Sequence, residues 1–147
     1  MLQRILQLND VKDDSLFLWG PRQTGKSTLL KTLFPEVPYY DLLKSEEYTK
    51  YKLKPSLLRE ECEMLDAGSV VIIDEVQKIP ALLDEVHWLI VNCDIHFILC
   101  GSSARKLKRG GANMLGGRAL RNNLFPLVSC EIGDFDLMRA IHHGMIP

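Results

Sequence analysis

The residues with the clearest chemical pattern are the nine of GPRQTGKST, at positions 20 to 28. Gly20, Gly25, Lys26 and Ser27 fit the spacing G-x-x-x-x-G-K-[ST] in full. Glycine leaves backbone N–H groups open to approach and lysine adds a cation, so a loop of this kind can surround a polyphosphate. A helix that follows the loop aims its positive dipole end at the same anion. We therefore predict a nucleotide phosphate site, in preference to a glycine turn that happens to precede a lysine-bearing helix.

The expected ligand of this loop is ATP with Mg²⁺. Lys26 is expected to reach the β- and γ-phosphates, the Ser27 hydroxyl to coordinate Mg²⁺, and Thr28 to make a lesser phosphate contact. Gly20 and Gly25 are expected to adopt dihedral angles that other residues avoid. The whole predicted nucleotide-binding set is Gly20, Pro21, Arg22, Gln23, Thr24, Gly25, Lys26, Ser27 and Thr28.

An acidic pair follows a buried strand in the stretch VVIIDE. Asp74 at the carboxyl end of that strand is predicted to complete the metal site begun by Ser27. Glu75 is predicted to act as the general base that polarises an attacking water. Alone, the pair would read as polar residues closing a strand. The phosphate loop some fifty residues earlier favours the metal role, and the second carboxylate argues against a small-molecule kinase.

A third group of candidate residues lies in FILCGSSARKL, where a strand ends at Gly101. If this strand lies between the strands that carry the loop and the acidic pair, a serine hydroxyl here can bond the γ-phosphate or the attacking water. Ser102 is the preferred residue. The alternative is a serine turn that caps a helix beginning near Ala104.

The segment from residue 95 to residue 130 contains no Asp or Glu. Arg118, in GGRAL, is a candidate arginine finger, acting within the molecule or toward a neighbouring subunit. A solvated basic face is an equally good interpretation for any single arginine. A nucleic-acid surface is also open, although positions 98 to 124 contain no aromatic residue on which a base could stack. The basic residues are Arg105, Lys106, Lys108, Arg109, Arg118 and Arg121.

Strands alternating with helices must position these residues. Apolar runs predict strands at 15–19, 38–43, 69–74, 95–100 and 124–132, and a weak helical turn is expected at 2–8. Helices are expected from the loop to Pro35, between Pro55 and Gly68, after Pro80 and near Ala104, with 44–54 a polar surface stretch. This alternation predicts an α/β fold with a mostly parallel sheet, whose ligands bind at the carboxyl ends of the strands.

The bulk composition is that of one globular domain spanning 1–147. A hydrophobic fraction of 46% can build a core, and a net charge of -1 points to neither nucleic acid nor membrane as a default partner. The longest apolar runs, LFLW and VVII, are too short for a membrane span or a signal core. We expect a cytoplasmic protein with no membrane partner.

Together, LFLWGPRQTGKSTLL, VVIIDEVQKIPALLDEV, FILCGSSARKLKRGGANMLGGRA and LFPLVSCEIGDF resemble the prokaryotic AAA-superfamily predicted ATPases. The resemblance implies a three-layer P-loop fold of the ASCE type with strand order 5-1-4-3-2. It implies ATP hydrolysis with Ser102 at the sensor position, and the remaining chemistry carried by Lys26, Ser27, Asp74 and Glu75. Longer members continue into a C-terminal domain, whereas this sequence stops at Pro147, so the lid and that domain are expected to be missing.

Two functions of different classes are compatible with these residues. The first is an ATPase that releases ADP and phosphate. The second is a nucleotide-dependent switch with little turnover that acts on a protein or DNA partner, which the basic segment favours. A homo-oligomer is compatible with both, and a P-loop kinase is a third, weaker interpretation.

Overall fold

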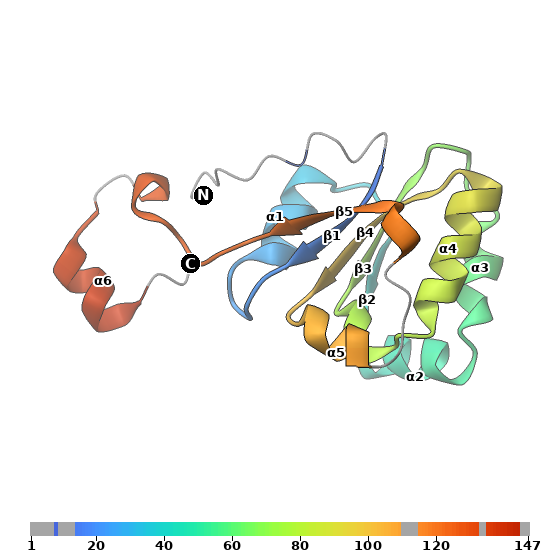
Figure 1. Cartoon of the computed structure of the whole chain (residues 1–147), viewed down its shortest axis with the longest axis horizontal. Helices are drawn as coiled ribbons and strands as arrows, with labels where there is room; N and C mark the ends of the chain where they lie inside the picture. The colour runs from blue at the N-terminus through green and yellow to red at the C-terminus, as the bar shows by residue number, and fades with distance from the viewer. Residues whose placement is uncertain (1–7, 9–13, 110–114, 133–134, 145–147) are drawn as a thin grey trace.

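The computed structural model describes residue 8 and residues 14–109, 115–132 and 135–144. Five strands form one parallel sheet in the order β2-β3-β4-β1-β5 (Figure 1). Read from the other edge, this is the predicted order 5-1-4-3-2, which is therefore confirmed. The strands are β1 (Ser15–Trp19), β2 (Tyr39–Asp41), β3 (Val70–Asp74), β4 (His96–Gly101) and β5 (Ala119–Asn123).

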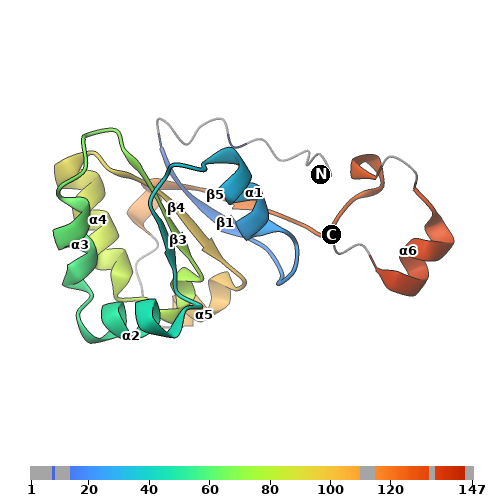
Figure 2. The same ribbon diagram turned by 180° about the vertical axis from the view of Figure 1, so that it is seen from behind.

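Helices cover both faces of the sheet and give the predicted three layers (Figures 1 and 2). Leu16 and Leu18 of β1 pack with Leu30 of α1 (Lys26–Leu33) on one face. Phe17 and Trp19, which alternate with them, stack on each other and belong to the core of the other face. That second face is covered by α2 (Ser45–Leu53), α3 (Ser56–Cys62), α4 (Leu82–Cys93) and α5 (Ala104–Arg109).

Shorter elements complete the described chain. Three 3-10 turns are η2 (Val76–Lys78), η3 (Leu115–Gly117) and η4 (Ser129–Glu131). The last helix, α6 (Leu137–His143), lies apart from the three layers and has no buried residue (Figure 1). Across the described residues, no helix combines the length and apolar character needed to cross a lipid bilayer.

The stretch 44–54, expected only as a polar surface segment, is mostly the helix α2. Its charges suit a helix, because Glu46 and Glu47 lie in the first turn and Lys50 and Lys52 in the last, where each sign opposes the helix dipole. Tyr51 anchors the helix to the core and is almost fully buried. A single buried aromatic residue in a charged segment gives little periodic signal, and for this reason the helix was not predicted.

The fifth strand was predicted wrongly at 124–132 and lies instead at Ala119–Asn123. This strand is at the edge of the sheet and pairs only with β1, so polar side chains such as Arg121 can remain exposed. The more apolar stretch that follows contains Pro126 and a 3-10 turn. The helical turn expected at 2–8 falls, except for residue 8, outside the described residues.

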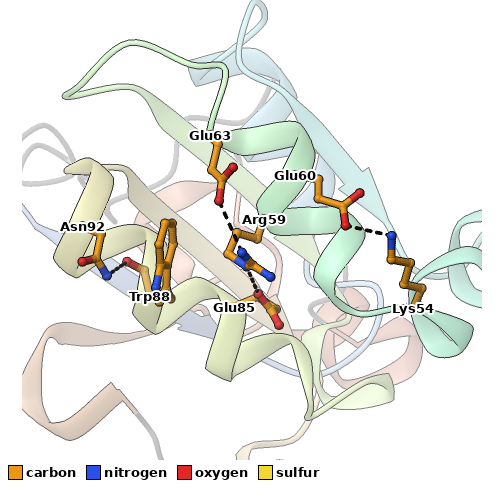
Figure 3. Close-up of polar contacts among 7 residues, drawn as sticks. All are labelled: Lys54, Arg59, Glu60, Glu63, Glu85, Trp88 and Asn92. Carbon is orange, nitrogen blue, oxygen red and sulfur yellow. Dashed lines mark hydrogen bonds and ion pairs between the residues drawn. The ribbon is translucent and has the colours of Figure 1, made fainter.

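A cluster of charged residues joins α3 to α4 on the outside of the second face (Figure 3). The Arg59 side chain donates from Nε to Glu85 over 2.9 Å and forms an ion pair with Glu63 over 3.5 Å. Its guanidinium also lies over the Trp88 ring, 5.3 Å from the ring centre. The pair between Lys54 and Glu60 in the same view, at 2.8 Å, is exposed and has no comparable third contact within the described part of the chain.

We expect Arg59→Met to lower the melting temperature by a few degrees, because this side chain supplies an ion pair and a ring contact between α3 and α4 and a further ion pair at the end of α3. The matched change Lys54→Met removes one exposed pair and should have almost no effect. Thermal unfolding followed by circular dichroism in 0.1 M and 1 M NaCl measures both. A loss for Arg59→Met that is no larger than that for Lys54→Met would contradict this assignment.

Candidate phosphate-binding site

The loop between β1 and α1 has the backbone that phosphate binding requires. Gly25, immediately before α1, has φ +84°, as predicted for this glycine, and Lys26 is the first residue of the helix. Gln23 also has a positive φ, +62°, although it is not a glycine. These two residues with positive φ turn the chain into α1, and the first N–H groups of a helix have no partner within the helix.

Gly20 has a different role from the one predicted. Its φ is not in the left-handed region, so it does not supply an unusual dihedral angle. Instead, a Cβ at this position would lie 2.2 Å from the carbonyl oxygen of Leu124, at the end of β5. Glycine is required because two backbones approach closely here, where the Leu124 N–H also donates to the Trp19 carbonyl over 2.7 Å.

Lys26 is folded back onto its own loop. Its ammonium donates to the carbonyl oxygens of Gly20 and Pro21, each over 2.7 Å, and the residue is buried. Burial lowers the pKa of Lys26, and the negative charges of Glu75 and Asp74 oppose that shift. Two neutral carbonyl oxygens therefore hold the Lys26 ammonium at the loop.

Ser27 and Asp74 are in direct contact, as the predicted metal site requires. The Ser27 hydroxyl donates to Asp74 Oδ2 over 2.6 Å. The Tyr39 hydroxyl, from β2, donates to the same oxygen over 2.5 Å. Burial and this bond to Asp74 raise the pKa of Tyr39, so the phenol stays a donor at any physiological pH. Three elements thus meet at one carboxylate oxygen, which is buried at the edge of the sheet.

These donors suit Mg²⁺. One carboxylate and one hydroxyl leave most of an octahedral shell to water and phosphate oxygens, the arrangement in which Mg²⁺ is usually bound beside nucleotides. Among the described residues, no group of three or more His, Cys, Asp or Glu side chains forms an all-protein metal cage. Ser27 and Asp74 are therefore the residues that would hold the ion.

Glu75 lies one residue beyond β3 with φ +59°, a left-handed conformation uncommon for glutamate. Gln77 Nε2 donates to Glu75 Oε2, and Ser102 Oγ donates to the same oxygen over 3.3 Å. Strand β4, which ends beside Ser102, lies between β1 and β3 as the prediction for Ser102 assumed. The fold therefore brings Glu75 and Ser102 into direct contact, and Gln77 forms a hydrogen bond with each of them.

A cavity of about 350 Å³ opens over the loop. Six of the nine predicted nucleotide-binding residues line it, together with Glu75 and with Leu43, which follows β2. Gly20, Pro21 and Thr24 do not line this cavity. Thr24 is buried, and its hydroxyl donates to the Pro21 carbonyl over 2.9 Å. The six residues that line it are Arg22, Gln23, Gly25, Lys26, Ser27 and Thr28.

Arg118 lies at the amino-terminal ends of the strands, whereas the loop lies at their carboxyl ends. It precedes Ala119, which pairs with Ser15 at the beginning of β1, whereas the loop follows Trp19 at the end of that strand. The length of β1 alone separates the two by about 15 Å. Within one chain Arg118 does not meet the phosphate cavity, so only its possible action on a neighbouring copy stays as a prediction.

A second cavity, of about 500 Å³, lies beside the loop at the ends of β4, β1 and β5. Its lining includes Arg105 and Arg121, no carboxylate, and the 66% exposed ring of Phe125. The fold thereby places aromatic residues next to the basic segment, although the basic segment itself contains none. Ser102 lines this second cavity and does not line the phosphate cavity.

The fold and the site together define a P-loop nucleotide-binding protein. The sequence matches the family described as "AAA domain" over residues 12–133, which is most of the chain. The chain belongs to that family, and this membership implies nucleotide binding.

Among solved structures, 108 chains match. One is the Aeropyrum pernix ORC2 protein in its ADP form, with a TM-score of 0.52 and 14% sequence identity. The match covers 80% of this chain and 44% of that one, so the matched part spans less than half the length of the ORC2 chain. At this identity the likeness shows the fold alone. No curated protein matches the sequence.

Two residues of the site were missed by the sequence analysis. Tyr39 was assigned only to a strand, because nothing in PYYD shows which of its side chains faces the end of β3. Gln77 lies three residues after Asp74, but a glutamine has no charge or metal affinity that would single it out. Both are recognised only when the strand register is known.

We expect Tyr39→Phe to lower the free energy of unfolding of the nucleotide-free protein by about 1 kcal/mol, because Asp74 loses one of two hydroxyl donors. Tyr48→Phe is the matched control, since the Tyr48 ring contacts the Lys78 ammonium but its hydroxyl makes no hydrogen bond within the described residues. Urea unfolding of both variants measures the difference. Equal stability of the two would show that the Tyr39 bond contributes nothing.

Proposed function

We propose that this protein binds ATP with Mg²⁺ and hydrolyses it to ADP and phosphate. The proposal rests on the hydrogen bond from Ser27 to Asp74, because Ser27 lines the same cavity as Lys26 and Glu75. A P-loop, a metal-binding pair and a second carboxylate are the parts that hydrolysis of a terminal phosphate needs. Family membership supports nucleotide binding, and the Glu75 carboxylate supports hydrolysis.

Binding would begin at the loop. The N–H groups at the start of α1 face the phosphates, and the Lys26 ammonium exchanges its two carbonyl acceptors for phosphate oxygens with more negative charge. Ser27 and Asp74 would hold the Mg²⁺, which would offset negative charge on the phosphates. Because Lys26 is buried before the ligand arrives, it needs no further desolvation to meet the phosphates.

Glu75 would take the proton of the attacking water. Its carboxylate lies at the cavity, close enough to Lys26 for their charges to interact. A water between Glu75 and the γ-phosphate would lose its proton as it attacks, and ADP would leave. Ser102, bonded to the same carboxylate, is proposed to sense the γ-phosphate or that water.

We expect Glu75→Gln to reduce phosphate release by roughly a hundredfold or more while ATP still binds, because a general base contributes about 10²–10⁴ to rate. Lys26→Ala should weaken ATP binding itself, as calorimetry would show. Matched controls are Glu36→Gln and Lys52→Ala, both exposed residues away from the cavity. Equal release from the wild type, Glu75→Gln and Lys26→Ala would rule out the enzyme, and transfer to an acceptor without free phosphate would indicate a kinase.

A second function, a nucleotide-dependent switch that acts on single-stranded DNA, is supported by the second cavity. Arg105 and Arg121 can meet phosphodiesters, and the exposed Phe125 ring can stack on a base. Assembly of several copies is compatible with this function, and it would let Arg118 of one copy approach the nucleotide of another. A protein partner in place of DNA is the competing form of the switch.

We expect Arg121→Ala to weaken binding of a labelled oligothymidylate several-fold and to reduce the salt slope of the affinity by about one, because one phosphate contact is lost. Arg139→Ala, on α6 and outside the cavity, is the matched control. Fluorescence anisotropy between 50 and 200 mM salt would measure both. Absence of binding at 50 mM salt, or an equal effect of the two changes, would exclude DNA as the partner of this cavity.

A further inference from the structure

The Glu75 carboxylate is held through one of its two oxygens. Gln77 Nε2 and Ser102 Oγ both donate to Oε2, and Gln77 Nε2 also donates to Ser102 Oγ over 3.1 Å. Within the described part of the chain, Oε1 forms no hydrogen bond. One oxygen is therefore anchored, and the other is left for a proton donor in the cavity that Glu75 lines.

Gln77 is itself fixed in place. Its side chain is buried, with 8% exposed, and it packs so closely on β4 that a Cβ at Gly101 would lie 2.3 Å from Gln77 Oε1. That Oε1 is buried and has no hydrogen-bond partner among the described residues. The amide group cannot rotate by half a turn, because Gln77 Oε1 would then face Glu75 Oε2, and two acceptor oxygens repel each other.

The backbone also directs Gln77 toward Glu75. Glu75 is in the left-handed region, and the 3-10 turn η2 begins at the next residue. This places the side chains of residues 75 and 77 on the same side, between the ends of β3 and β4. The buried oxygen of Gln77, left without a partner, costs stability that a methionine at this position would not cost. The arrangement therefore favours positioning of the carboxylate over maximal stability.

We propose that Gln77 is the positioning residue of the general base, in that it anchors Glu75 Oε2 so that Oε1 faces the attacking water. This inference rests on the proposed hydrolysis. Gln77 does not line the phosphate cavity, so it acts through Glu75 and does not touch the nucleotide. A residue of this kind changes the rate of the chemical step and leaves nucleotide affinity unchanged.

The first test is the kinetics of Gln77→Met, which keeps the length of the side chain and removes its donor. We expect kcat to fall roughly tenfold to hundredfold, with KM for ATP and the calorimetric Kd unchanged. In a Glu75→Gln background the same change should have almost no further effect, because both residues act in one unit. Lys78→Met is the matched control in the same 3-10 turn: it loses a bond to the Leu42 carbonyl and should keep the wild-type kcat.

A Gln77→Met protein with wild-type kcat, or one that loses ATP affinity and rate together, would overturn the proposal. If Gln77→Met does not fold, Gln77→Glu is the second variant. It keeps the shape of the side chain and places a carboxylate against Glu75. The same loss of kcat is expected.

A second test does not need turnover. In crystals of nucleotide-free protein, we expect the Glu75 side chain to occupy one conformation in the wild type and more than one in Gln77→Met. A single, wild-type conformation in the variant would overturn the anchoring. If the wild type released phosphate no faster than Lys26→Ala, the proposed hydrolysis would fail, and the crystallographic comparison would still decide whether Gln77 positions Glu75.

Discussion

The site depends on the parallel pairing of β4 between β1 and β3. In a parallel sheet all carboxyl ends lie at one edge, so the loop after β1, the acidic pair after β3 and Ser102 after β4 converge without any long insertion. The contacts across this edge are short: Ser27 to Asp74 at 2.6 Å and Ser102 to Glu75 at 3.3 Å. If the central strand order were different, these residues would be present but separated by one or more strand spacings of about 4.8 Å.

The strand order also determines what each residue of the loop does. Because β5 pairs with the free edge of β1, its chain passes directly over the start of the loop, and Gly20 must lack a side chain to admit Leu124. Gly25, by contrast, is required by its φ of +84° at the beginning of α1. The two glycines of one motif are thus required for different reasons: Gly20 by tertiary packing, and Gly25 by local backbone geometry.

Much of the fold could be predicted from the sequence, because buried parallel strands are apolar along their whole length. Apart from Asp74 and His96 at their ends, this holds for VVIID and HFILC, which predicted β3 and β4. The glycine-lysine spacing predicted the loop between β1 and α1. The edge strand β5 could not be predicted in this way. Among the described residues no strand lies on its outer side, so its residues need not be apolar. Its position follows from backbone pairing with β1.

The site could be predicted only for residues whose chemistry is distinctive by itself. The residue types and their spacing predicted four site residues: Lys26, Ser27, Asp74 and Glu75. Of these, Lys26, Asp74 and Glu75 are buried. Tyr39 and Gln77 act only through their contacts with Asp74 and Glu75, and such contacts require the register. The position of Arg118 at the amino-terminal ends of the strands likewise follows from the pairing of β5 with β1, and the composition of its segment gives no sign of it.

The distribution of buried polar side chains supports a functional reason for this geometry. Among the described residues, the buried polar or charged side chains are Ser15, Thr24, Lys26, Asp74, Glu75 and Gln77. Ser15 accepts a hydrogen bond from the Phe97 N–H and is satisfied structurally. All the others lie in the loop or at the acidic pair. Burying a charge costs free energy unless partners compensate it, and here Lys26 has only carbonyl partners while Gln77 keeps an acceptor unbonded. A core selected for stability alone would not concentrate these costs at one edge of the sheet, whereas a site that must meet a highly charged ligand with groups already in place would.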